Sequence, residues 1–521
     1  MTTVSEGLPP ARKAELRAAA IKVTVAALVA AGLFTLYARE VRVEAQVKAL
    51  LDGQRIAGGR AGGARAELNR DTPKGWLSAE EALSRALALQ PSNPWAVAAY
   101  ADVEVLLAGQ GLEDRAARAD EALARAEARS APFAERFDAH ALRLIQDGHA
   151  AEAEPYLMAV SEKYGRSSPI LTDGLGRAQR ASGKLPEARA SFKKAQDADW
   201  RSPRFVADYA QALLEEGAAT EALTACERAL QANSDHVRAQ ITKARTLVAL
   251  FRDGRASGDL KLARSLADSA VERDLPPVMK AQALASRAEV RLAEGDKAGA
   301  AQDADAAANA GPQVAAALRA QALVAAAEKK PEAAALFTAA LAADPWDAST
   351  YFNGAAALAE AGDDAAGEKL LFAYAATLPR TARYHLALAR IVSRKGDAKS
   401  AQGELAKAQQ LEPTNALVYF EEGRLAQMQK DTKAAVAAYE RAAQLRDDFP
   451  EVYRQMGELY LENKDVQAAL RVFNEALARY KAARAPAPEM EAFYAQVEQG
   501  VSRAGQKKLA AQWVKEARAT H

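Results

Sequence analysis

The feature that most constrains the fold is a proline that recurs at a constant interval. Pro345, Pro379 and Pro413 lie 34 residues apart, twice in succession. Each follows an alanine- and leucine-rich stretch with helical character, and a proline there ends one helix and opens the turn to the next. A constant interval of this length predicts an array of similar helical units rather than one globular core.

Windows aligned on these prolines hold small and large residues at fixed positions. The windows begin at Val314, Ala348, Ala382, Ala416 and Pro450. Position 20 is small in all of them: Ala333, Gly367, Ala401, Ala435 and Ala469. Position 24 is bulky: Phe337, Leu371, Leu405, Tyr439 and Phe473. A small residue lets two backbones approach and a large one fills the space beside them, so each window predicts a hairpin of two packed helices.

The period and these positions resemble the tetratricopeptide repeat (TPR). The best unit spans residues 450–483, and its matching residues are Tyr453, Met456, Gly457, Tyr460, Ala469, Phe473 and Ala476, with Lys481 in place of the family's closing proline. The register extends back to windows near Lys280, Pro203 and Pro169, with a longer loop expected at residues 251–259. The resemblance implies an all-α, right-handed α-solenoid of ten to twelve helix-turn-helix hairpins over residues 76–483, closed by capping helices in residues 484–521.

Residues 18–38 form a separate apolar segment near the N-terminus. The run carries one charge, Lys22, and is flanked by Arg17 and Arg39. A helix of this length spans roughly 30 Å, the thickness of the hydrocarbon core of a bilayer. We expect a retained transmembrane helix, with a cleaved signal sequence and a buried core helix as the alternatives.

The segments around this run complete the predicted organisation. Residues 1–17 form a short tail, and residues 39–75 a helical extension followed by a flexible tether at the glycine-rich stretch 57–66. Positive residues are nearly balanced on the two sides of the apolar run, so the positive-inside rule does not fix its orientation. A single early span after a short tail resembles an uncleaved signal-anchor, which exports the rest of the chain.

No pattern for catalysis, a metal or a cofactor stands out. The chain has 69 basic and 68 acidic residues, interleaved along its length, and no long basic block that would favour nucleic acid. The five histidines do not pair at metal-ligand spacing, and Cys226 falls at the bulky core position of its repeat. We therefore predict that the protein is not an enzyme, binds no cofactor and does not bind nucleic acid.

The TPR resemblance implies a concave groove lined by positions 2, 5, 6 and 9 of each first helix, where such proteins typically hold a peptide or a partner helix. The candidate groove residues are Arg177, Arg204, Arg238, Arg245, Phe352, Arg383, Arg390, Phe420, Arg424 and Arg454. Arginine binds carboxylates through its planar fork, which favours an acidic or C-terminal peptide. The alternative is ordinary surface charge, balanced by Asp138, Asp173, Asp208 and Glu421.

These patterns together predict a membrane-anchored TPR scaffold that binds other proteins. The favoured setting is a bacterial inner membrane with the array in the periplasm, in an assembly, secretion, pilus or surface machine. Two alternatives remain: an array that faces the cytosol and recruits proteins to the membrane, and a non-catalytic subunit of an envelope enzyme complex.

Overall fold

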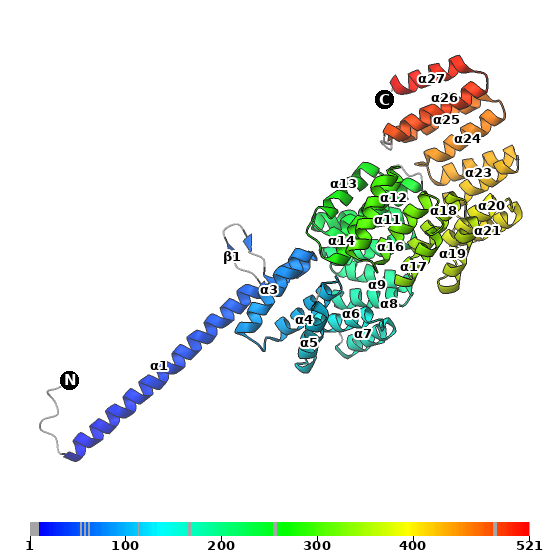
Figure 1. Ribbon diagram of the computed structural model, residues 1–521. Coiled ribbons are helices and arrows are strands. Elements are labelled where there is room, and N and C mark those ends of the chain that lie inside the picture. The colour runs from blue at the N-terminus through cyan, green and yellow to red at the C-terminus, as the bar shows by residue number, and fades with distance from the viewer. Residues whose placement is uncertain are drawn as a thin grey trace.

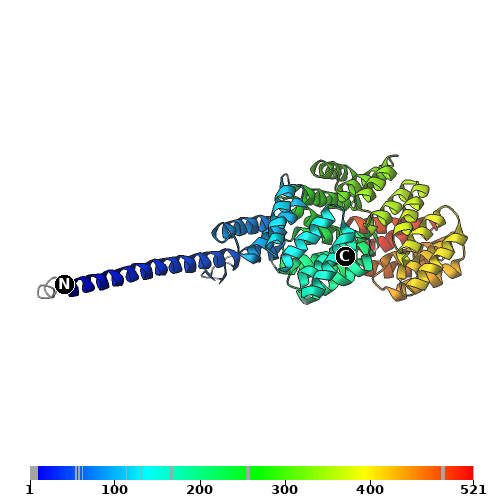
Figure 2. The same cartoon turned by 90° about the horizontal axis from the view of Figure 1, so that it is seen from below.

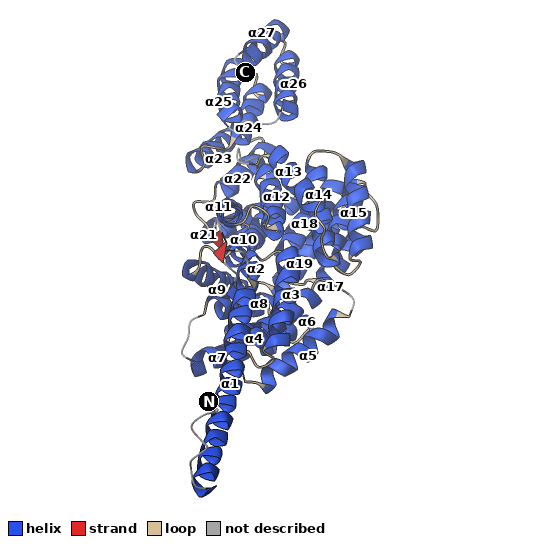
Figure 3. Cartoon of the chain, turned by 90° about the vertical axis from the view of Figure 1, so that its left-hand side faces the viewer, coloured by secondary structure: helices blue, strands red, loops and turns tan. Residues whose placement is uncertain are grey.

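The computed structural model describes residues 10–52, 55–56, 59–60, 63–112, 114–130, 132–164, 168–253, 258–482 and 487–519; for residues 10–18, 55–56, 59–60 and 487–489 it describes the backbone alone. Within these ranges the fold is helical, apart from one pair of two-residue strands, β1 (Arg55–Ile56) and β2 (Gly59–Arg60), which run antiparallel (Figure 3). The predicted all-α class is confirmed.

The described part of the chain has 27 helices, and α4 to α27 form twelve consecutive hairpins. The helices are α1 (Pro10–Asp52), α2 (Ala64–Arg70), α3 (Pro73–Leu89), α4 (Pro94–Ala108), α5 (Arg115–Ala128), α6 (Ala134–Gln146), α7 (Ala150–Tyr164), α8 (Pro169–Ala181), α9 (Leu185–Ala198), α10 (Pro203–Glu216), α11 (Ala219–Ala232), α12 (Val237–Arg252), α13 (Leu260–Val271), α14 (Pro277–Ala293), α15 (Lys297–Ala310), α16 (Ala315–Ala327), α17 (Ala333–Ala343), α18 (Ala348–Ala361), α19 (Asp364–Thr377), α20 (Ala382–Arg394), α21 (Ala398–Leu411), α22 (Ala416–Met428), α23 (Thr432–Leu445), α24 (Pro450–Glu462), α25 (Val466–Ala482), α26 (Ala487–Arg503) and α27 (Lys507–Ala519).

A two-residue motif forms the turn between the two helices of a hairpin. The first residue takes a left-handed conformation: Gly396 between α20 and α21 (φ 83°) and Lys430 between α22 and α23 (φ 62°). The second is an aspartate that caps the next helix, and the carboxylate of Asp397 accepts from the backbone N–H of Ser400 at 3.0 Å. Asp431 caps α23 in the same way, so the turn recurs with the period of the repeat.

The packing positions expected from the sequence are occupied as predicted. The five bulky residues at position 24 are all buried, with Phe337 and Tyr439 fully inaccessible. Gly423 on α22 lies so close to the ring of Tyr439 that an added Cβ would meet it at 2.5 Å. The large side chain of each second helix therefore packs onto a small residue of the first, and the helices stack as a TPR-type solenoid.

Helix α1 projects from the array as a long rod (Figures 1 and 2). The predicted apolar run and its helical extension form one continuous helix that ends at Asp52. The part from Ala19 contains an 18-residue window of mean hydropathy 2.0, none of it buried. Its length and composition suit a membrane span, and a signal sequence passes the same test.

The array does not hang from α1 on a free tether, contrary to the prediction. Val47 and Leu51 of α1 are buried in the same cluster as Trp76 of α3, and Asp52 pairs with Arg65 of α2 at 3.0 Å. These apolar residues recur at helical spacing, so α3 covers them as it would any amphipathic helix. Of the predicted glycine-rich tether, residues 59–60 lie in β2 and 64–66 in α2, while 57, 58, 61 and 62 lie outside the described residues.

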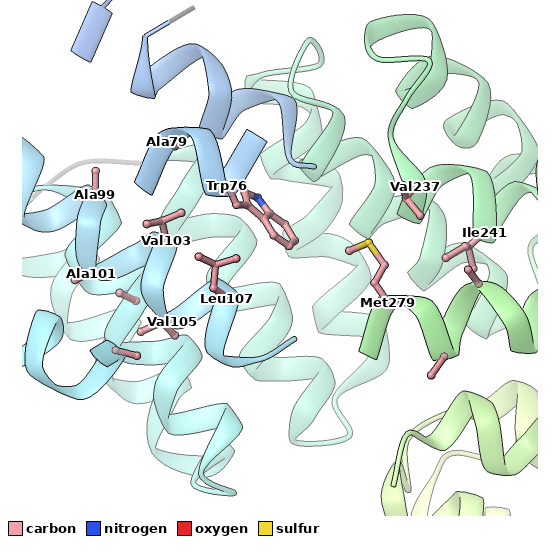
Figure 4. Packing of buried hydrophobic residues seen from close by; sticks show 14 of the residues in the cluster. Trp76, Ala79, Ala99, Ala101, Val103, Val105, Leu107, Val237, Ile241 and Met279 are labelled. Atoms are coloured by element: carbon pink, nitrogen blue, oxygen red, sulfur yellow. The ribbon is translucent and has the colours of Figure 1, made fainter. Parts of the chain in front are cut away.

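One apolar cluster joins hairpins that are distant in sequence. Trp76 of α3 and Leu107 of α4 share it with Val237 of α12 and Met279 of α14 (Figure 4). Beside it, the backbone N–H of residue 278 donates to the carbonyl of Gln110 at 3.1 Å. The N-terminal helices therefore pack against helices of the following superhelical turn.

Candidate binding groove

Ion pairs and hydrogen bonds also cross the superhelix farther along the array. Arg180 on α8 donates to Glu215 on α10 and to Asp344 after α17, both at 2.8 Å. Arg446 after α23 donates to the carbonyl of Asp253 after α12 at 2.7 Å. These contacts therefore join helices that are several repeats apart in the sequence.

Arg238 is part of a buried seam at the N-terminal end of the array. It pairs with Asp71, at the C-terminus of α2, at 2.5 Å, and also with Asp208 of α10. His236 contacts the same Asp71 carboxylate at 3.0 Å. Burial alone would raise the pKa of Asp71, but the Arg238 guanidinium and His236 hold it well below its ordinary value. Arg238 is thus committed to joining α2 to α10 and α12.

Arg177 and Arg204 belong to a group of alternating acidic and basic side chains inside the array. They donate to the two oxygens of buried Asp138 at 2.5 Å and 2.6 Å. Asp173 lies 3.4 Å from Arg177 and 3.3 Å from Arg204, but neither of its oxygens has a hydrogen-bond partner. Burial, aided by repulsion from Asp208, raises the pKa of Asp173 to about 7. These two arginines balance carboxylates of their own array, which is the alternative that the sequence left open.

Arg245 is enclosed beside a second internal network. Arg319 of α16 donates to Glu289 of α14 at 2.9 Å and to Asp347 at 2.5 Å. Arg245 of α12 reaches Glu289 only at 3.8 Å, and its Nε is buried without a hydrogen-bond partner. Burial and the neighbouring Arg319 guanidinium lower the pKa of Arg245. A ligand could reach this guanidinium only by displacing the surrounding side chains.

The two predicted groove aromatics belong to the core. Phe352 of α18 and Phe420 of α22 are each only 7% exposed. The Arg383 guanidinium lies 4.4 Å from the ring centroid of Phe352 and donates to the carbonyl of Glu215 at 3.4 Å. The prediction that these rings line an open groove is wrong, because alanine-rich helices pack closely enough to cover them. Arg383 is itself part of the contact between α10 and α20.

Three arginines remain partly exposed on first helices near the C-terminal end. Arg390 of α20 and Arg424 of α22 bind one shared carboxylate, that of Glu421, at 2.8 Å and 3.1 Å, and their side chains are 41% and 48% exposed. Arg454 of α24 pairs within its own helix with Glu451 and, at 3.2 Å, with Glu458. Glu421 itself is buried, but the side chains of Arg390 and Arg424 keep an exposed side through which a ligand could reach them.

The ten candidate residues thus divide into two sets. Seven are buried or bound into contacts of the closed superhelix: Arg177, Arg204, Arg238, Arg245, Phe352, Arg383 and Phe420. Three lie on α20, α22 and α24, toward the end of the array where the last helices stack outward (Figures 1 and 3). We define the groove face as the first-helix residues around Arg390, Arg424 and Arg454.

Sequence reasoning missed the partners of the buried arginines. Asp71, Glu215 and Asp344 hold arginines from other repeats, and no local spacing relates them. Glu451, Glu458 and Glu462 could have been found, because they occupy positions 2, 9 and 13 of the repeat that begins at Pro450.

The groups considered for chemistry have structural surroundings. Cys226 is fully buried, and burial raises the pKa of its thiol to about 12. His385 lies in the core with its Nδ1 2.6 Å from Glu404. Among the described residues no three His, Cys, Asp or Glu side chains gather as a metal site would require.

Comparisons with known proteins return no family and only distant likenesses to solved structures. No protein-family model matches the sequence, and no curated protein matches it. Among solved structures, a chain of the APC/C hetero-tetramer Cut9–Hcn1 is 15% identical with a TM-score of 0.43, covering 87% of this chain and 95% of that one. Yeast Tom70 is 14% identical with a TM-score of 0.39, covering 74% and 96%. A tetratricopeptide repeat protein from Parabacteroides merdae is 16% identical with a TM-score of 0.28, covering 57% and 98%.

Proposed function

We propose that the protein is a single-pass membrane scaffold that binds segments of other proteins on its groove face. The observation that carries this proposal is that an apolar exposed segment and a set of partly exposed arginines lie at opposite ends of the described chain. The apolar segment of α1 is exposed at one end, and the last turns of α1 pack directly against the array. The partly exposed arginines lie near the other end of the array. A bilayer would cover the first feature and a partner protein the second.

The partner proposed for the basic part of the groove face is an acidic segment. Arg390 and Arg424 share one directly paired carboxylate, that of Glu421, and Asp253 and Glu360 attract Arg390 only from farther away. A carboxylate from a partner would complete the pairing through the planar guanidinium groups. The favoured setting is the periplasmic side of a bacterial inner membrane, in an envelope assembly, secretion, pilus or surface machine.

Two experiments test the proposal. The first is membrane topology: alkaline phosphatase fused to the C-terminus should be active and a fluorescent protein there dark. The reverse result would place the array in the cytosol, and release of the chain from membranes after cleavage of α1 would identify a signal sequence.

The second experiment tests the groove face in cells. A photo-crosslinking residue at Met428, which is exposed at the end of α22, should capture a protein in the otherwise wild-type chain and lose it in Arg390→Glu/Arg424→Glu. The matched control is Arg441→Glu/Arg471→Glu, which makes the same charge change on exposed residues of the second helices α23 and α25. Equal capture by all three proteins would show that the groove-face arginines do not bind the partner.

A further inference from the structure

The groove face carries segregated charge. On α20 and α22, two guanidinium groups, of Arg390 and Arg424, surround one carboxylate, that of Glu421. On α24 the ratio is inverted, because Arg454 is bound by Glu451 at 2.6 Å and by Glu458 at 3.2 Å, and Glu462 lies on the same helix. The face is therefore basic at its α20–α22 end and acidic at its α24 end.

The carboxylates at the acidic end lie close enough to repel one another. Burial raises the pKa of Glu458, and Glu451 and Glu462 raise it further, against the opposing effect of Arg454. One guanidinium does not neutralise three carboxylates. A cation that approached this helix would relieve the repulsion as well as form new pairs.

The last carboxylate is held in position by a side-chain relay. The hydroxyl of Tyr439 donates to the amide oxygen of Gln427 at 3.0 Å, and the amide nitrogen of Gln427 donates to Glu462 at 3.2 Å. Tyr439 is fully buried, so it fixes the orientation of Gln427 and hence that of Glu462.

An apolar side chain is exposed at the end of α22, the middle first helix of the face. Met428, at the end of α22, is 57% exposed, and its sulfur accepts from the hydroxyl of Ser393 on α20 at 3.4 Å. Methionine adapts its shape to different apolar partners. Its place on α22, which precedes α24 and follows α20 in the array, suits an uncharged stretch of a ligand.

We propose that this face binds one extended protein segment that carries acidic side chains at one end and basic side chains at the other, with an uncharged stretch between them. The proposal rests on the proposed function, since it takes α20 to α24 to be a site for another protein. Packed helices lie on the order of 10 Å apart, so Arg390 on α20, two repeats from α24, lies roughly 20 Å from the carboxylates of α24. That distance corresponds to about six residues of extended chain. The order of charges would also orient the segment in the groove.

Binding of labelled synthetic peptides to the full chain in detergent tests this directly. The bipolar probe has two aspartates and two lysines separated by six uncharged residues that include leucine. The comparison probes are a peptide of the same composition with alternating charges, an all-acidic peptide and an all-basic peptide. We expect the bipolar probe to bind at least tenfold more tightly than the other three.

Two charge-reversal variants assign the ends. Arg390→Glu/Arg424→Glu should weaken the bipolar probe about tenfold and strengthen the all-basic one, whereas Glu458→Lys/Glu462→Lys should weaken the bipolar probe and strengthen the all-acidic one. All four residues are partly or fully solvent-exposed, and an unchanged thermal midpoint would show that each variant folds.

The outcomes separate this inference from the proposed function. Equal binding of the bipolar and all-acidic probes, with no effect of Glu458→Lys/Glu462→Lys, would overturn the bipolar segment and leave the acidic partner in place. Absence of binding by every probe would overturn the inference, and the crosslink at Met428 would then decide whether a protein-binding face exists at all.

Discussion

Arg180 on α8 and Asp344 after α17 form an ion pair of 2.8 Å although 164 residues separate them in the chain. The same guanidinium binds Glu215 on α10. Contacts of this kind are foreign to an open solenoid, in which each repeat touches only its neighbours. They join the middle of this array into one unit. A substitution in one repeat therefore alters contacts made by a repeat four hairpins away.

Replacing Arg180 should therefore cost far more stability than replacing a surface arginine. Arg180→Met leaves Glu215 and Asp344 as unpaired, mostly buried carboxylates, and we expect the free energy of unfolding to fall by about 2–4 kcal/mol. Arg85→Met is the control, because Arg85 pairs with Glu81 at 3.4 Å where both side chains are 68% exposed; its effect should stay below about 0.5 kcal/mol.

Urea denaturation would measure both effects, and a double-mutant cycle with Asp344→Asn would isolate the pair that crosses the superhelix. A coupling energy near zero between residues 180 and 344 would mean that this ion pair does not stabilise the contact between α8 and the end of α17.

Stability should also fall as the pH rises from about 4 to 7. The pKa of Asp173 is raised to about 7 by burial and by Asp208, and burial and Asp138 raise that of Asp102. In this window the folded state keeps protons that the unfolded state has already lost, so each further rise in pH favours unfolding. The groups whose pKa is lowered, such as Asp71 and Asp347, act in the opposite direction, but only at lower pH.

Asp173→Asn tests the assignment, because the amide keeps the shape and removes the titration. Above pH 7 the variant should be more stable than the wild type by about 1–2 kcal/mol, and the fall in thermal midpoint between pH 5 and pH 7 should be smaller. The same slope in both proteins would exclude Asp173 as its source.

The repeat was readable from the sequence because its determinants are local. Small residues at position 20 and bulky residues at position 24 act within one hairpin, and they were predicted in register. The aspartate caps are equally local, but the sequence analysis did not predict them. The contacts between distant repeats could not be predicted from the sequence, because they depend on small rotations that accumulate over many repeats. That is why Phe352 was expected in a groove and lies in the core, and why the partners of Arg180 and Arg238 were missed.

The tether was mispredicted for a different reason. Glycines at residues 58, 59, 62 and 63 suggested a break between anchor and array, but the apolar stripe of α1 that ends at Leu51 lies before them. The groove face was predicted in part: its arginines follow from the repeat register, whereas the sharing of Glu421 by two of them requires the structure.

Two glycines of neighbouring hairpins should respond to alanine in opposite ways. At Gly423 a Cβ would meet the Tyr439 ring at 2.5 Å, so Gly423→Ala should destabilise the array by about 1–3 kcal/mol. Gly403, inside α21, has nothing within 4 Å of that position, so Gly403→Ala should stabilise it by about 0.5–1 kcal/mol. A thermal midpoint that does not fall in Gly423→Ala would contradict the close approach of α22 and α23, and one that falls in Gly403→Ala would contradict the open space at that position.

The contact between α1 and α3 should hold the array at a fixed orientation on its anchor. Spin labels at Val41 and Leu89, both exposed and on opposite sides of the contact, should give one narrow distance distribution in lipid nanodiscs, with fully buried Cys226 replaced by alanine. Val47→Asp puts a charge into the buried cluster, and because an unpaired charge there is strongly unfavourable, the distribution should broaden. Lys48→Asp is the matched control, since residue 48 is exposed on the same turn of α1. A broad distribution in the wild type, or a narrow one in Val47→Asp, would mean that α1 and the array move independently and that the array can take many orientations above the membrane.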